Sequence, residues 1–129
     1  MNKNFLQIAA LSGALAVALG AFAAHKLRDM LPVDWVAVFE TGVRYQFLHT
    51  LALLAVAIIT EKFPGKSLTR SGNCFIAGII LFCGSLYSLA VLRILDVTGV
   101  NTIVGILTPV GGLFFIAGWL FLLWGVSKK

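Results

Sequence analysis

The stretch FLQIAALSGALAVALGAFAA, residues 5–24, decides the class of fold to which this chain belongs. Gln7 and Ser12 are its only polar interruptions. The hydrocarbon core of a bilayer is about 30 Å thick, and a helix needs about 20 apolar residues to cross it. A helix also satisfies its own backbone hydrogen bonds, which lipid cannot do. We therefore expect residues 5–24 to form a transmembrane helix.

This first stretch also contains Ala21-Phe22-Ala23, which has the small-x-small form of a signal-peptide cleavage site. The apolar core of a signal peptide usually has about 7–15 residues, fewer than the stretch contains. Three further candidate spans follow it in the sequence. We therefore expect the stretch to remain in the protein as its first helix.

The composition of the chain excludes an ordinary water-soluble fold. Of its 129 residues, 60% are hydrophobic and only 12% are charged, whereas about a quarter are charged in soluble domains. The mean hydropathy is +0.99, and four apolar blocks fill most of the length. We predict an all-α membrane protein whose four transmembrane helices form one compact bundle and a single domain over residues 1–129. The helices are expected near residues 5–24, 35–60, 74–93 and 103–126.

The basic residues lie at the ends of the apolar blocks. A net charge of +5 and a pI near 9.6 would also suit a nucleic-acid-binding protein. Their placement instead indicates topology signals and contacts with anionic headgroups, so we expect the lipid bilayer as a partner and no nucleic acid. Six basic residues fall on the side of the termini (Lys3, Lys62, Lys66, Arg70, Lys128, Lys129) and four on the other (Lys26, Arg28, Arg44, Arg93). The positive-inside rule then predicts a multi-pass protein of the plasma (inner) membrane with both termini in the cytoplasm.

The second block is apolar only over residues 45–60, which is short for a crossing. We expect its helix to begin at Trp35, with Asp34 as the N-cap. This extension brings in Glu40 and Arg44, which are four residues apart in the favourable order. They are interpreted either as a self-neutralised pair or as an ion gate or substrate clamp.

His49, with Gln46 one turn before it, is the deepest ionisable residue of the second block. Ionisable groups inside a membrane segment are costly and often functional, and imidazole can shuttle protons or bind a metal. The alternative is a packing role in which His49 bonds to Ser85 or Tyr87 on another helix. No second ligand stands at metal-binding spacing, and His25 lies at a helix end, so we expect no metal, cofactor or catalytic residue.

The fourth block contains Thr108-Pro109-Val110-Gly111-Gly112. Proline removes a helical hydrogen bond, so we expect a kink or a local opening near residues 105–112, with Thr108 as the nearest partner for a freed carbonyl. Transporters build sites at such breaks, whereas an ordinary proline kink serves close helix packing.

These observations leave several functions open. No nucleophile beside a base, phosphate loop or pair of catalytic carboxylates is present, which disfavours an enzyme. Our main hypothesis is a structural or accessory membrane component that packs with itself as a homo-oligomer or within a larger complex. The alternative is an oligomeric transporter or channel for a small solute or proton. The candidate polar cluster comprises His25, Glu40, Arg44, Gln46, His49, Ser85, Tyr87, Thr108 and Pro109.

Four stretches of the chain carry a resemblance to a known family: residues 20–25 (GAFAAH), 39–49 (FETGVRYQFLH), 84–87 (GSLY) and 108–112 (TPVGG), together with Gly118-Trp119. In this order they resemble the domain of unknown function 423 family of small bacterial membrane proteins. The family often has Gly at the position of Ala23 and Ala at the positions of Gly42 and Thr50. The resemblance implies a four-helix plasma-membrane protein. It supplies no activity, substrate or cofactor.

Overall fold

The computed structural model describes residues 1–128, and Lys129 lies outside the described residues. Every regular element in residues 1–128 is helical: α1 (Lys3–Phe22), the π-helical turn η1 (Ala23–Leu27), α2 (Arg28–Met30), α3 (Val33–Ile59), α4 (Lys66–Gly78), the π-helical turn η2 (Ile79–Cys83), α5 (Gly84–Ile94) and α6 (Asn101–Ser127). They form four continuous spans, long and apolar enough to cross a membrane: Lys3–Met30, Val33–Ile59, Lys66–Ile94 and Asn101–Ser127. The predicted all-α class with four transmembrane helices is confirmed.

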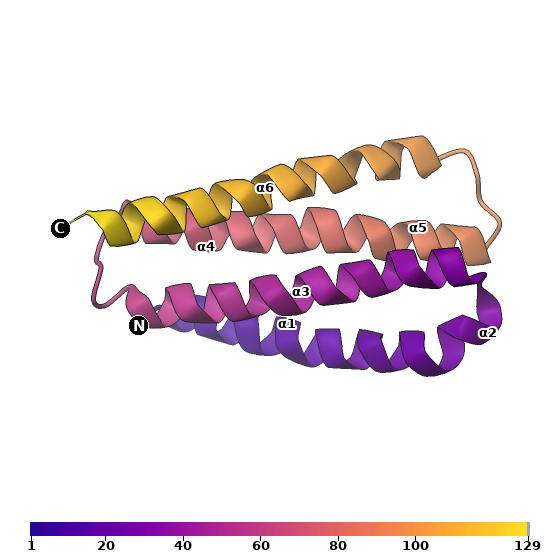
Figure 1. Ribbon diagram of the computed structural model, residues 1–129, viewed down its shortest axis with the longest axis horizontal. Helices are drawn as coiled ribbons and strands as arrows, with labels where there is room; N and C mark the ends of the chain where they lie inside the picture. Colours follow the sequence, from indigo (N-terminus) through magenta and orange to yellow (C-terminus); the bar gives the residue numbers. More distant parts are fainter. Residues whose placement is uncertain (129) are drawn as a thin grey trace.

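The four spans lie side by side and run up and down in turn (Figure 1). The two termini and the turn between α3 and α4 lie at one end of the bundle, and the two other connections lie at the opposite end. The first span packs mainly on α3, α3 packs on the third span, and α6 packs on the other side of the third span. α6 therefore packs mainly on the third span.

The third span begins at Lys66, although the apolar block predicts a start near residue 74. Residues 66–73, which precede the expected helix start, form the first turns of α4. Leu68, Ser71, Gly72 and Phe75 are buried at the i, i+3, i+4, i+7 spacing of one helix face. Because two members of this inner face are the small residues serine and glycine, hydrophobicity alone places the helix start too late.

The first span continues past the predicted end at residue 24 to Met30. Ala23 and Leu27 are buried against α3 in the cluster that also contains Phe39. The polar residues between them, including His25 and Lys26, are exposed on the opposite face. The extension is amphipathic, so it carries charge and still packs.

Asp34 does not cap the second span. α3 begins at Val33 with Pro32 as its N-cap, and no side chain bonds to its first amides. Asp34 lies in the first turn. Its carboxylate there still interacts favourably with the positive end of the helix dipole.

Pro109 lies within α6, which is one uninterrupted α-helix from Asn101 to Ser127. The local opening expected near residues 105–112 is therefore absent. The departures from α-geometry in residues 1–128 are the π-helical turns η1 and η2 of the first and third spans. A proline has no amide N–H to donate to the carbonyl four residues earlier, so one helical hydrogen bond is missing. Its fixed φ is nevertheless a helical value, so the helix continues on both sides of it.

The buried apolar residues form two clusters at different depths. One includes Phe5, Leu53 and Phe75, nearer the termini, and the other includes Leu27 and Phe39, nearer the opposite end. On α1 and α3 the buried residues between the two clusters include four polar ones: Ser12, Gln46, His49 and Thr50. The inner face of the bundle thus has an apolar, polar, apolar sequence along its length.

Candidate functional site: a buried polar layer

Gln46 lies at the centre of the polar layer and is only 4% exposed. Its amide Nε2 donates to the Ser12 carbonyl oxygen of α1 at 2.9 Å. The Tyr87 hydroxyl of α5 donates to Gln46 Oε1 at 2.7 Å. One side chain of α3 thus bonds to two neighbouring helices at once, with donors and acceptors matched.

Ser12 and Thr50 extend this network between α1 and α3. Their hydroxyl oxygens are 2.7 Å apart, and Ser12 Oγ also lies 3.4 Å from Gln46 Nε2. Neither residue belongs to the polar cluster predicted from the sequence. Thr50 is one helical turn after Gln46, so the spacing of four residues could have placed both on the same face.

His49 is bonded through both ring nitrogens. Its Nδ1 lies 2.8 Å from the Tyr45 carbonyl oxygen, and its Nε2 lies 3.1 Å from Trp119 Nε1 on α6. An indole N–H only donates, so Nε2 accepts and Nδ1 carries the proton that bonds to the carbonyl. The contacts fit a neutral imidazole. The prediction that His49 bonds to Ser85 or Tyr87 is wrong, since its partners are Tyr45 and Trp119.

Aromatic rings enclose the imidazole of His49. The Phe115 ring stacks on it with centroids 3.6 Å apart and an interplanar angle of 12°. Phe75 and Trp119 approach at 5.7 Å and 5.9 Å. His49 is 5% exposed, so it belongs to the packed interior.

Ser85 and Thr108 form a separate contact between α5 and α6. Their hydroxyl oxygens are 2.6 Å apart, and Ser85 also donates to the Phe82 carbonyl of its own helix at 2.8 Å. The Thr108 hydroxyl therefore donates to Ser85, and the expectation that it would meet a carbonyl freed by Pro109 is wrong. A further contact lies between α4 and α6, where Ser71 donates to the Gly118 carbonyl at 2.7 Å.

Glu40 pairs with Arg28 rather than with Arg44. The carboxylate and guanidinium are 3.8 Å apart, and both side chains are substantially exposed. The helical continuation of the first span carries Arg28 to the start of α3, which the predicted loop could not show. Within residues 1–128 no carboxylate pairs with Arg44, which is exposed. His25 is exposed on the first span and does not join His49.

A groove of about 440 Å³ lies beside His49 between α3 and α6. It is lined mainly by apolar and aromatic residues, including Tyr45, Phe82, Pro109, Leu113 and Trp119. Both nitrogens of His49 are already bonded, so the groove meets the imidazole without a free polar atom. No group of three or more metal-ligating side chains occurs in the part of the chain that the structure describes.

Comparison with known proteins identifies relatives but no activity. Residues 19–112 match the family described as Protein of unknown function (DUF423). The chain is 41% identical to the UPF0382 membrane protein YwdK of Bacillus subtilis, over 98% of both chains. It is 42% identical to a UPF0382 membrane protein of Haemophilus influenzae, over 100% of this chain and 98% of the relative. It is 37% identical to the UPF0382 inner membrane protein YgdD of Escherichia coli, over 99% and 93%.

These matches show that the chain belongs to the DUF423 family, in agreement with the resemblance carried by its four motifs. No solved structure matches it significantly. The relatives are named membrane proteins, and this chain has four helices that are long and apolar enough to cross a membrane.

Proposed function

We propose that this member of the DUF423 family is a structural or accessory component of the plasma membrane, and that its polar layer fixes the arrangement of its own helices. The observation that carries this proposal is the pairing of the layer within the chain. Gln46 bonds to two other helices, and His49 bonds to α6 and to its own backbone. A buried polar group that is fully bonded stabilises one packing arrangement.

A transport path through one bundle would need polar side chains that face a lumen. The groove beside His49 instead lies on the side of the bundle and has a mainly apolar lining. Its size and lining suit lipid chains better than a hydrated solute. This supports the accessory role over transport through a single chain.

The proposed topology places both termini in the cytoplasm. The termini, the turn after α3 and the start of α4 lie at one end of the bundle (Figure 1). These segments carry Lys3, Lys62, Lys66, Arg70 and Lys128. The positive-inside rule assigns the more basic end to the cytoplasm. Fusions of a fluorescent protein and of alkaline phosphatase after residue 129 would test it. Fluorescence of the first fusion is expected. Phosphatase activity of the second fusion would show that the C-terminus lies outside the cytoplasm.

Site-specific photocrosslinking in native membranes tests the accessory role. A photoreactive phenylalanine analogue would replace Leu113 or Leu120 on α6, or Leu11 on α1, all of which are 59–66% exposed. The same analogue at Leu53, which is fully buried, controls for reaction with the chain itself. One partner protein crosslinked in stoichiometric amounts from one face is expected.

The opposite result is equally well defined. Crosslinks to further copies of this chain alone, from every exposed position, would contradict an accessory role in a larger complex. An oligomer with α6 around a shared centre would then become the better hypothesis.

A further inference from the structure

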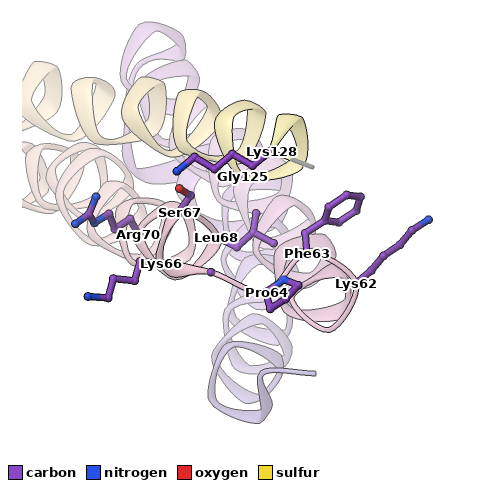
Figure 2. Close-up of a pocket in the computed structure, with 10 residues that line it drawn as sticks. Lys62, Phe63, Pro64, Lys66, Ser67, Leu68, Arg70, Gly125 and Lys128 are labelled. Atoms are coloured by element: carbon purple, nitrogen blue, oxygen red, sulfur yellow. The ribbon is translucent and has the colours of Figure 1, made fainter.

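A basic pocket lies at the end of the bundle that carries the termini, between the start of α4 and the end of α6 (Figure 2). Its volume is about 650 Å³. The side chains of Lys66, Arg70 and Lys128 extend to the same side of the view, whereas Lys62 extends to the other side. Four cations line the pocket, and three of them, Lys66, Arg70 and Lys128, belong to the start of α4 and the end of α6.

These three cations have no acidic partner among residues 1–128. The one carboxylate side chain at this end of the bundle, Glu61, lies 3.7 Å from the Met1 amino group instead. The first amides of α4 also lie at the pocket, since Lys66, Ser67 and Leu68 line it and no side chain caps the helix. Together these groups form an uncompensated positive surface that suits the oxygens of a phosphate.

An apolar groove of about 450 Å³ adjoins this pocket on α6. Leu120, Leu123 and Trp124 line it and are about 60% exposed, and Lys128 lines both the groove and the pocket. The Lys128 ammonium lies 5.2 Å from the centre of the Trp124 ring. A basic site thus continues into an apolar track that follows α6 toward the middle of the bilayer, which is the arrangement of a phospholipid headgroup and its chain.

We propose that this end of the bundle binds one anionic phospholipid, with its phosphate among Lys66, Arg70 and Lys128 and an acyl chain along Leu120 and Leu123. A free phosphate would use the same cations. The adjoining apolar groove favours the lipid as the source of the phosphate. This inference is independent of the proposed accessory role, because it rests on the ends of α4 and α6 alone.

The test uses the full chain purified in detergent and native mass spectrometry. Phosphatidylglycerol and phosphatidylcholine with identical acyl chains are added in equal amounts, and the bound lipid is counted. The chain is expected to retain one phosphatidylglycerol in preference to phosphatidylcholine. A basic side chain near an anionic lipid surface changes affinity roughly fivefold, so the triple variant K66Q/R70Q/K128Q should lose affinity on the order of a hundredfold.

A matched control removes the same charge from the other end of the bundle. The variant K26Q/R44Q/R93Q has the same net charge as the pocket variant, and all three control residues are exposed. It should retain the lipid. Equal losses in the two triple variants would overturn the site, because only the total charge would then matter.

Two further measurements keep the result decisive. Lys128 lies at an exposed helix end, so Lys128→Gln alone can be measured even if the triple variant fails to fold. It should lower the affinity for phosphatidylglycerol roughly fivefold. Inorganic phosphate at millimolar concentration should not displace the lipid. Displacement by phosphate, or equal retention of phosphatidylcholine, would refute a phospholipid site.

Discussion

A close approach of α6 to the backbone of η2 predicts a sharp difference between two neighbouring glycines. A Cβ atom at Gly111 of α6 would lie 2.7 Å from the Phe82 Cα of η2, and closer still to the Phe82 amide nitrogen. A Cβ atom at Gly112 would meet nothing nearer than Phe82 Cδ2, at 3.9 Å. The substitution Gly111→Ala therefore collides with backbone, whereas Gly112→Ala enters ordinary van der Waals space.

The magnitude follows from two opposing terms. Alanine is more favourable than glycine in a helix by roughly 0.5–1 kcal/mol, and this gain applies at both positions. Overpacking against a neighbour costs about 1–3 kcal/mol, and the backbone of Phe82 places Gly111→Ala toward the upper end. We expect a net loss of about 2 kcal/mol for Gly111→Ala and a small gain for Gly112→Ala, so their unfolding equilibria should differ roughly a hundredfold.

Unfolding in mixed micelles, with sodium dodecyl sulfate as denaturant and circular dichroism as the signal, measures this difference. Gly112→Ala serves as the control, because it makes the same chemical change one residue away in the same helix. If the two variants unfolded at the same detergent fraction, α6 and η2 would not approach as closely as the structure shows.

Three further predictions concern the polar contacts and use the same unfolding assay. Gln46→Leu should lower the free energy of unfolding by about 1–3 kcal/mol, because it leaves the Tyr87 hydroxyl unpaired. Adding Tyr87→Phe should recover part of that loss. If the losses of the two single variants simply added in the double variant, the bond between the two side chains would be contradicted. His49→Phe keeps a ring against Phe115 and should lower the free energy of unfolding by about 1 kcal/mol. His49→Ala opens a cavity and should lower it by roughly 2–4 kcal/mol. Equal losses in the two variants would argue against a packing role for the His49 ring. Ser71→Ala removes a buried bond between α4 and α6 and should cost about 0.5–1.5 kcal/mol, and no measurable change would indicate that this bond is absent in the micelle.

The number and type of helices could be predicted from the sequence because bilayer thickness requires long apolar runs. The ends of the first and third spans could not. At both ends the inner face is made of small or isolated apolar residues, such as Ser71 and Leu27, and the outer face carries charge. Burial there depends on the neighbouring helix, which a hydropathy average along one chain does not include.

The same limit applies to the candidate site. Gln46, His49, Ser85 and Tyr87 were recognised as polar residues inside apolar blocks, and the structure buries or half-buries all four. Their partners could not be read from the sequence, since that requires the rotation of each helix about its axis. The donation from Trp119 of α6 to His49 of α3 is one such contact, because the two residues are 70 positions apart in the sequence.

The bonds of α6 bear on whether the bundle can alternate between two arrangements. Three side-chain hydrogen bonds tie α6 to other helices, through Trp119, Thr108 and the Gly118 carbonyl. Interhelical bonds in membranes average about 0.6 kcal/mol each, so breaking all three costs about 2 kcal/mol. The loss of backbone contact at Gly111 adds to this cost. A state with α6 displaced would then be populated at a few per cent or less in the absence of a ligand that binds it.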